Sequence, residues 1–130
     1  MLLTPFSLIE GYKKGIFPMA ESKNDKSIFW VSPELRGIIR LSNFIVPKSL
    51  KKLIKKNIYK VKINHDFLNI INCCAQLDYK RRETWINQII IDNYTKLHEL
   101  QLASSVECYQ EEELVGGLYG VQLGKFFFGL

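Results

Sequence analysis

The end of the chain, from residue 103 to residue 128, consists of closely spaced runs of residues that favour β-strands. The three runs cover residues 103–109, 114–121 and 126–128, and only short turns separate them. Consecutive strands with such short connections pair in an antiparallel sheet. This stretch therefore predicts an antiparallel meander, and the residues before it must supply the layer that packs on the sheet.

Two amphipathic helices are predicted immediately before the meander. In the first, Asp66 is placed to cap the helix, and the apolar residues that share one face are Phe67, Ile70, Ile71 and Cys74. The second helix covers residues 86–101, and its apolar stripe is formed by Ile89, Ile90, Tyr94, Leu97 and Leu100. These apolar faces predict that both helices pack on the sheet.

The N-terminal residues predict a helix followed by short strands. Thr4, followed by a proline, marks the start of the helix, and Gly15 marks its end. Residues 15–20 are expected to form an apolar loop, and residues 28–31 and 37–41 two short strands. We therefore expect a small unit of mixed helix and strand here.

A basic helix and one further strand are predicted before the two amphipathic helices. Residues 49–56 form the helix, with Leu50, Leu53 and Ile54 expected to face inward. In residues 59–63 apolar residues alternate with lysines, which predicts a half-buried strand.

Taken in order, these elements predict the α+β fold class. We expect a small N-terminal α/β domain at residues 1–36 and a second domain at residues 37–130. The composition, with 47% hydrophobic and 24% charged residues, is that of an ordinary globular protein and argues against disorder.

The net charge of +5 favours an anionic partner, and nucleic acid is the commonest such partner. The basic helix concentrates part of this charge in Lys48, Lys51, Lys52 and Lys55. A charge run of this kind is typical of a solvated helix face, which is one interpretation. The other is a surface for a phosphate backbone, which the two further lysines of the following strand favour.

The cysteines and histidines give no pattern of a disulfide or a metal site. Cys73 and Cys74 are adjacent, and neighbouring side chains suit neither a normal disulfide nor tetrahedral zinc ligation. His65 and His98 lie in no metal-binding spacing. We therefore expect free thiols in a reducing cytosol. The sequence also has no apolar run of about 18 residues, so no transmembrane helix is expected.

Two apolar or aromatic segments have both a structural and a functional interpretation. Ile16, Phe17 and Met19 surround a proline in the expected loop, where they either pack onto the core or form the wall of a pocket. Trp85 follows a basic cluster at residues 80–82. It either packs as a hydrophobic staple or stacks on a nucleic-acid base, with phosphates held by the neighbouring cations.

Glycines are unusually frequent in the second strand-like run and directly after it. Gly116, Gly117, Gly120 and Gly124 lie where glycine weakens a strand. Such glycines mark a bulge or the close approach of another backbone or a ligand. The pattern is not that of a dinucleotide-binding loop, because no GxGxxG string opens a helix here.

Taken together, these motifs resemble the leucyl/phenylalanyl-tRNA–protein transferase family. The strings that carry the resemblance include GYKKGIFPM at 11–19, WVSPELR at 30–36, TWI at 84–86 and LVGGLYGVQLG at 114–124. Shorter matches are Ser49-Leu50, Leu97-His98 and Ser105-Val106-Glu107. Their order and spacing agree with the family across nearly the whole chain.

The resemblance implies a fold, an activity and partners. The fold is an acetyltransferase-like (GNAT-like) domain behind a small N-terminal domain. The activity is the transfer of leucine or phenylalanine from aminoacyl-tRNA to the N-terminal arginine or lysine of a protein, which marks that protein for degradation. No metal, nucleotide or acetyl-CoA cofactor is implied, and the expected location is the cytoplasm.

The resemblance also implies roles for particular residues. Trp85 matches the aromatic residue that stacks on the terminal adenine of the tRNA. Leu118 and Phe127 match walls of the pocket for the leucine or phenylalanine side chain, and Met19 lies where some relatives carry a tryptophan beside that pocket. Lys48, Lys51, Lys52 and Lys55 are the candidates for the tRNA phosphates.

The sequence departs from the family pattern at two positions and lacks one of its strands. The catalytic glutamate is expected directly after Gly129, where this sequence has Leu130, and the family's later glutamine-bearing strand is absent. Ser104 replaces a common histidine. We therefore assign no catalytic residue in this chain and expect it to be a truncated, catalytically incomplete transferase.

Two hypotheses of function follow. The first is an incomplete or split aminoacyltransferase, which a complementing C-terminal polypeptide completes. The second is a non-catalytic remnant that binds the 3′ end of aminoacyl-tRNA. A generic basic nucleic-acid-binding domain is a weaker explanation, because it leaves the GIFPM and LVGGLYGV strings unexplained.

Overall fold

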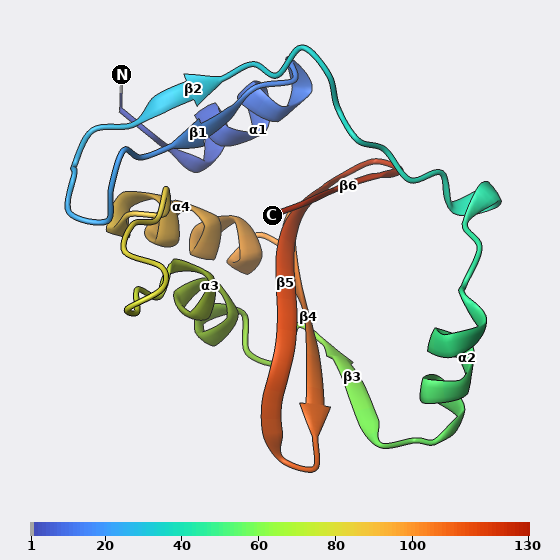
Figure 1. The fold of residues 1–130 in the computed structure, drawn as a ribbon. Coiled ribbons are helices and arrows are strands. Elements are labelled where there is room, and N and C mark those ends of the chain that lie inside the picture. Colours follow the sequence, from blue (N-terminus) through green and yellow to red (C-terminus); the bar gives the residue numbers. More distant parts are fainter. Residues whose placement is uncertain (1) are drawn as a thin grey trace.

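The computed structural model describes residues 2–130, which form a two-stranded sheet, a four-stranded sheet and several helices, three of which pack around the core (Figure 1). The predicted α+β class is therefore confirmed. In chain order the elements are α1 (Pro5–Lys13), β1 (Phe17–Met19), β2 (Phe29–Val31), the 3₁₀ turn η1 (Leu41–Asn43), α2 (Lys48–Lys55), β3 (Tyr59–Ile63), α3 (Phe67–Ala75), α4 (Gln88–Glu99), β4 (Ala103–Gln110), β5 (Glu113–Leu123) and β6 (Phe126–Gly129).

The N-terminal helix begins where the sequence predicted. Thr4 and Ser7 form a reciprocal capping box, in which each side chain accepts from the other residue's backbone N–H. The expected loop at residues 15–20 is wrong in part, because β1 pairs with β2 in an antiparallel sheet. The guanidinium of Arg36 donates to the carbonyl of Gly15, so the end of the WVSPELR string contacts the turn between helix α1 and strand β1.

The predicted meander is confirmed and extended by one strand. The larger sheet has the order β3-β4-β5-β6, and every neighbouring pair is antiparallel. Glu111, with a φ of +56°, turns the chain from β4 into β5, and Gly124, with a φ of +57°, turns it into β6. The register shifts between Cys108 and Tyr109 of β4, where Val115 of β5 is left without a partner, so the bulge lies in β5.

Helices α3 and α4 cover one face of this sheet, which we call the covered face. Asp66 caps α3 as predicted. Helix α4 begins at Gln88, later than predicted, because the side chain of Asn87 accepts from the backbone N–H of Ile90 and serves as its cap. The core lies between these helices, helix α1 and the strands. Leu100 is a further correction, since it is 60% exposed at the end of α4.

Residues 37–58 form an arm that runs past the other side of the sheet (Figure 1). The predicted strand at 37–41 is wrong, because strand geometry needs a neighbour for its backbone groups and these residues are exposed. Helix α2 lies where it was predicted, but Leu50, Leu53 and Ile54 do not face inward: they are 40%, 39% and 61% exposed.

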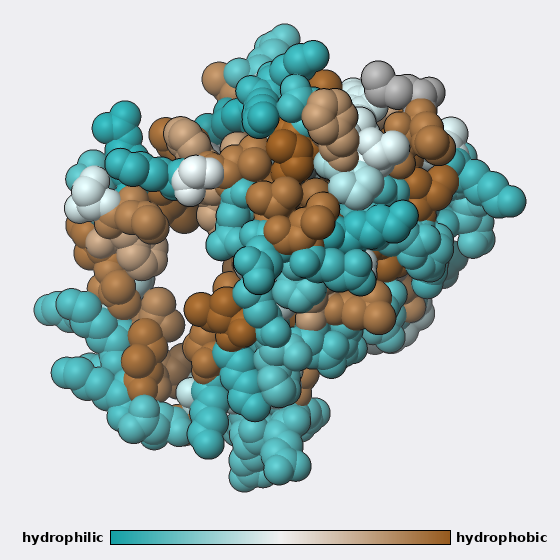
Figure 2. Space-filling view, turned by 180° about the vertical axis from the view of Figure 1, so that it is seen from behind, coloured by the Kyte–Doolittle hydropathy of each residue, from teal (hydrophilic) through white to brown (hydrophobic). Residues whose placement is uncertain are grey.

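Strand β3 follows the arm and is exposed at every residue, so the expected half-burial is also wrong. It pairs with β4, and the side chains that it presents on either face lack a covering layer within the described chain. In Figure 2, hydrophobic residues gather on both sides of an opening between the arm and the rest of the molecule. The sheet face on this side is called the open face below.

Candidate functional site

Trp85 lies in the loop before helix α4, and its backbone is held in place from two directions. Thr84 is buried, and its Oγ1 accepts from the backbone N–H of Ile86, which fixes the turn around Trp85. The carbonyl of Trp85 accepts from the N–H of Ala20 at 2.8 Å, which ties this loop to the end of strand β1. Met19 is the last residue of β1 and is half-buried, so two of the predicted site residues share one region.

Leu118 and Phe127 lie on the open face. Leu118 pairs with Val106 of β4, and Phe127 pairs with Gln122 of β5, which lies on the same side of the strand as Leu118. The intervening residues of β5 point to the covered face, where Tyr119 is completely buried. Leu118 is 41% exposed and Phe127 is 46% exposed, so both present apolar surface to solvent. This exposure is suited to binding an apolar ligand group.

The position of Phe127 depends on a glycine. A Cβ atom on Gly120 would lie 2.5 Å from the ring of Phe127 and 2.4 Å from the carbonyl oxygen of Phe128. Only glycine therefore lets β6 and the Phe127 ring approach β5 this closely. On the covered face a Cβ on Gly117 would lie 2.6 Å from Ile70 of helix α3. The close approaches expected from the glycine pattern are confirmed at these two positions.

The four candidate lysines of helix α2 are all exposed. Lys48, Lys52 and Lys55 recur at helical spacing and share a side of the helix that the apolar stripe leaves free. None of the four forms a salt bridge with another residue between positions 2 and 130. Their ammonium groups are therefore available to an anionic ligand.

The predicted site residues form three groups rather than one cluster. Trp85 and Met19 lie at the start of helix α4, Leu118 and Phe127 lie on the open face, and the lysines lie on the arm. Within residues 2–130 no hydrogen bond or ring contact joins the first group to the second. A ligand that touches all three groups must contact the loop before α4, the open face and the arm.

Sequence reasoning missed a tyrosine pair that links helix α1 to the sheet. The hydroxyl groups of Tyr12 and Tyr94 lie 2.6 Å apart in the core, and the ring of Tyr12 packs 5.1 Å from that of Phe128 in β6. Burial raises the pKa of Tyr12 to about 12, although the hydrogen bond to Tyr94 acts in the opposite direction. The only available signal was a tyrosine in each helical stripe, and nothing in the sequence pairs them.

Glu107 is a second buried polar group with a structural task. It is completely buried on the covered face, where it accepts from the backbone N–H of His65 at 2.8 Å and from the hydroxyl of Ser105. Asn64, with a φ of +58°, exchanges hydrogen bonds with the backbone of Ser105. These contacts hold the turn from β3 into α3, so the carboxylate of Glu107 is occupied and faces away from Leu118.

The open face carries no ionisable acid or histidine beside Leu118 and Phe127 in the part of the chain described. The register places apolar or neutral side chains there, namely Val61, Ile63, Ser104, Val106, Cys108 and Gln122. No cluster of three or more metal-ligating residues occurs among residues 2–130, and no helix in that range is long and apolar enough to cross a membrane. The described residues of the open face therefore offer apolar and aromatic surface for binding. They include no carboxylate or imidazole that could accept a proton beside Leu118 and Phe127.

Comparison with known proteins identifies the protein family that this chain resembles. The family model described as leucyl/phenylalanyl-tRNA protein transferase matches residues 38–130, and the model for the N-terminal domain of that family matches residues 1–34. A leucyl/phenylalanyl-tRNA–protein transferase of Maricaulis maris (strain MCS10) is 48% identical over 122 residues. The match covers 94% of this chain and 56% of the relative.

This chain belongs to the leucyl/phenylalanyl-tRNA–protein transferase family, as the resemblance of its motifs indicated. It spans about half the length of the curated relative that it matches.

Proposed function

We propose that the protein takes part in the transfer of leucine or phenylalanine from aminoacyl-tRNA to the N-terminal arginine or lysine of an acceptor protein, in the cytoplasm. The observation that carries this proposal is the family match over residues 38–130. The relative from Maricaulis maris bears the name of this activity. Tagging of the acceptor for degradation follows from the same activity.

In this proposal, each of the three groups of predicted site residues binds a different part of the aminoacyl-tRNA. Trp85 stacks on the terminal adenine, and Met19 lies beside it. Leu118 and Phe127 form walls for the aminoacyl side chain, which their half-exposed position on the open face supports. The lysines of helix α2 contact phosphates, which their exposure and lack of described ion pairs support.

The finer description of the fold is part of the same proposal. We assign residues 37–130 to the first part of an acetyltransferase-like domain and residues 1–36 to a small N-terminal domain. The antiparallel order β3-β4-β5-β6, with α3 and α4 on one face, supports the first assignment. Two separate family models meeting between residues 34 and 38 support the boundary.

Aminoacyl transfer needs a group that removes a proton from the attacking amine and donors that stabilise the developing negative charge. The described open face offers neither beside Leu118, so we assign this chain a binding task and the proton transfer to further polypeptide. The open face is a fitting surface for such a complementing polypeptide, because it exposes several apolar side chains and contiguous apolar patches mark interaction sites. The second candidate function is binding of the aminoacyl-tRNA 3′ end without transfer.

Substitution of Trp85 tests the binding proposal. Trp85→Ala is expected to weaken the binding of a phenylalanyl-adenosine analogue by about 1–3 kcal/mol, because stacking on the adenine is lost. Trp85→Phe retains an aromatic ring and is expected to recover much of that affinity. Isothermal titration calorimetry gives both values, and circular dichroism shows whether each variant is folded. Equal affinity of the Ala variant and the unchanged protein contradicts the stacking role.

A transfer assay separates the two candidate functions. The purified chain is incubated with radiolabelled leucyl-tRNA and a protein that begins with arginine, with a full-length family member as the positive control. We expect no turnover from the chain alone, and turnover after addition of the remaining part of a relative as a separate polypeptide. Binding of the analogue without turnover under either condition supports the non-catalytic function instead.

A further inference from the structure

The arm, residues 37–58, carries two groups of apolar side chains that are exposed to solvent. In its first half, Arg40 and Asn43 line a hollow of about 380 Å³ together with four apolar residues: Ile38, Ile39, Phe44 and Ile45. In its second half, helix α2 presents the stripe of Leu50, Leu53 and Ile54. Single exposed apolar residues are common, but a gathered set of this kind marks a surface that packs on another one.

The open face offers an apolar surface across the opening that separates it from the arm (Figure 2). Two neighbouring rows of paired residues cross it from β3 to β5: Val61, Cys108 and Gly116 in one, and Ile63, Val106 and Leu118 in the other. Gly116 has no side chain, and a Cβ atom there would have only an ordinary contact of 3.9 Å. The first row therefore leaves room at β5 for a side chain from a segment that lies on the sheet.

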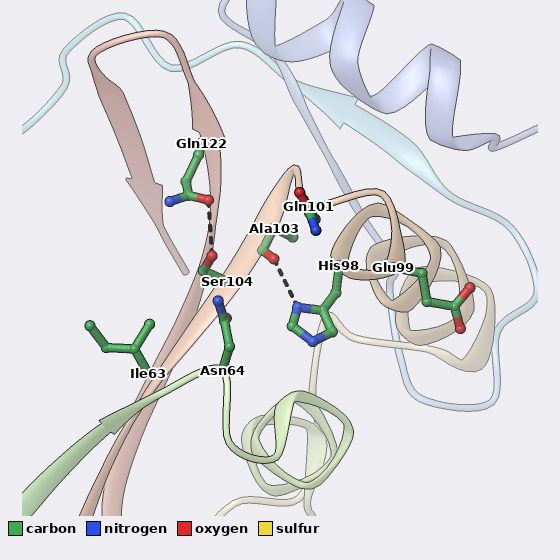
Figure 3. Close-up of a pocket in the computed structure, with 8 residues that line it drawn as sticks. All are labelled: Ile63, Asn64, His98, Glu99, Gln101, Ala103, Ser104 and Gln122. Atoms are coloured by element: carbon green, nitrogen blue, oxygen red, sulfur yellow. Dashed lines mark hydrogen bonds between the residues drawn. The ribbon is translucent and has the colours of Figure 1, made fainter.

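Polar side chains mark the end of this apolar surface. Beyond Ile63, the hydroxyl of Ser104 donates to Oε1 of Gln122 at 2.9 Å, across β4 and β5 (Figure 3). The pocket that these residues border is lined mostly by polar side chains. An apolar segment that covers the open face is therefore expected to lie over the two rows and not over this pocket.

The turn after helix α2 lets the helix fold back over these rows. Asn57 has a φ of +54°, and its N–H donates to the carbonyl of Ile54, which ends the helix and reverses the chain. Leu50 precedes Asn57 by seven residues, about 10 Å along a helix, and Val61 follows it by four, about 13 Å along a strand. A helix folded back at Asn57 thus brings Leu50 over the row of Val61 and Cys108.

The other end of the arm is also free to move. Gly37 directly follows Arg36, whose guanidinium is bound to the N-terminal unit. A Cβ atom on Gly37 would meet no atom within 4 Å, so the chain is unpacked at this point. Movement about Gly37 and Asn57 would leave the lysines of α2 in water, since Lys48, Lys52 and Lys55 lie on the side of the helix that the apolar stripe leaves free. Closing the arm therefore buries no lysine.

We propose that the arm is a lid that moves about Gly37 and Asn57 and packs its apolar side on the open face. Figure 1 shows the open arrangement. In the closed one, α2 lies over β3 and β4, because a helix about 10 Å wide covers two strands about 4.8 Å apart. The first half of the arm then covers Leu118 and Phe127 and excludes an apolar ligand group from them. This last consequence rests on the proposed function, whereas the closure itself does not.

A disulfide between the arm and the sheet tests the closure. Leu50→Cys places a thiol on the apolar side of α2, and Lys52→Cys places one on the opposite side; both are made together with Cys73→Ser, which removes an exposed thiol. Under oxidised glutathione, the introduced thiol of Leu50→Cys is expected to bond to the native Cys108. The bond should form about ten-fold faster than in Lys52→Cys, because a disulfide needs Cα atoms within about 7 Å. Mass spectrometry of unreduced peptides identifies the bond.

Three outcomes of this experiment overturn the lid. They are equal rates in the two variants, no bond to Cys108 in Leu50→Cys, and a bond that joins two molecules instead of one. The last result means that a second copy, and not the arm, occupies the open face. Labelling of both variants with iodoacetamide in urea provides the control, since the unfolded chains are expected to react equally.

Binding of the phenylalanyl-adenosine analogue tests what the lid controls. The oxidised Leu50→Cys protein is expected to bind it at least about ten-fold more weakly than the same protein after reduction, because the closed arm competes for the same apolar surface. The unchanged protein, oxidised and reduced in the same way, is expected to show one affinity. Equal affinity of the oxidised and reduced variant means that the lid does not control the aminoacyl wall. If the bond forms but neither state binds the analogue, the proposed function fails and the closure stands.

Discussion

The two faces of the larger sheet differ in what they contact, although both are apolar. On β5, Tyr119 and Val121 point to the covered face and are completely buried under helices α3 and α4. Leu118, between Gly117 and Tyr119 on the same strand, points to the open face and is 41% exposed, and Ile63 on β3 is 69% exposed. Strand β5 therefore contributes side chains both to the packed core and to a face that no described residue covers. The difference indicates that stability resides in the covered face, and it leaves the apolar side chains of the open face accessible to a ligand or partner.

The largest expected contrast between the faces comes from removing apolar side chains. Leu97→Ala is expected to destabilise the protein by about 2–5 kcal/mol, because Leu97 is completely buried and its loss leaves a cavity. Ile63→Ala, on the open face, is expected to change the free energy of unfolding by less than about 0.5 kcal/mol. Urea unfolding followed by circular dichroism measures both. Similar losses in the two variants contradict the comparison, because the open face then contributes to the core.

The glycines of β5 provide a second contrast, in which the expected change in the free energy of unfolding is smaller. Gly120→Ala is expected to cost about 1–3 kcal/mol, because its Cβ meets a backbone oxygen of β6 at 2.4 Å and must displace that strand. It should also weaken binding of the phenylalanyl-adenosine analogue, since Phe127 moves. Gly116→Ala is the matched control, as its Cβ has an ordinary contact of 3.9 Å with Cys108. An unfolding midpoint that falls equally in both variants shows that strand propensity, rather than close approach, explains the glycines.

The link between helix α1 and the covered face gives a pH-dependent prediction. Tyr12→Phe is expected to cost about 1–2 kcal/mol near neutral pH, because the buried hydroxyl of Tyr94 loses its partner. The pKa of Tyr12 is raised in the folded state from 10.0 to about 12, so the folded protein holds this proton more tightly than the unfolded chain. Its contribution is complete below pH 10 and is lost as the pH rises towards 12.

The deficit of the Tyr12→Phe variant should therefore narrow over that pH interval. Tyr79→Phe serves as the control, because Tyr79 is 81% exposed and the variant should be as stable as the unchanged protein. Chemical denaturation at a series of pH values from 7 upward provides the comparison. A deficit that stays constant through the interval argues against titration of this hydroxyl.

The arm provides the prediction with the smallest effect on stability. Replacing Lys51, Lys52 and Lys55 together with glutamine should change the free energy of unfolding by less than about 0.5 kcal/mol, as expected for exposed positions. The same variant should bind tRNA more weakly and reduce the slope of log affinity against log salt by about 2–3, since fewer counterions are released.

The control for the arm prediction keeps the net charge equal. It replaces Lys14, Lys23 and Lys26, which are exposed on the N-terminal unit, with glutamine. If both triple variants show the same salt slope, tRNA responds to total charge and the arm has no special role.

Those parts of the fold that depend on local signals were predicted from the sequence. The cap at Asp66, the stripes of α3 and α4 and the spacing of the three C-terminal strands each involve only a few neighbouring residues. The wrong predictions concern elements whose pairing or burial depends on residues that are far away in the sequence. The apolar stripe on α2 predicts an amphipathic helix, but it does not reveal whether another element packs on Leu50. Strand β1 was missed for the same reason, since its partner β2 follows only after a polar loop.

The candidate site shows the same division. The glycine pattern predicted close approaches, and their partners at Ile70 and Phe127 became visible only in three dimensions. The contact between Tyr12 and Tyr94 joins residues 82 positions apart, and no periodicity encodes such a pair. The roles of Trp85 and Leu118 come from family motifs and remain predictions that the experiments above examine.

The contact from Arg36 to Gly15 has a consequence for how the arm acts. It fixes the beginning of residues 37–58 on the N-terminal unit, and the pairing of β3 with β4 fixes their end on the sheet. The segment that carries the α2 lysines is therefore tethered at both ends. If these lysines contact phosphates as proposed, a ligand already bound elsewhere on the protein meets them at an effective concentration of about millimolar. Contacts between these lysines and the phosphates of a bound tRNA would then be intramolecular. Even weak contacts of this type would lengthen the residence time of the tRNA on the protein.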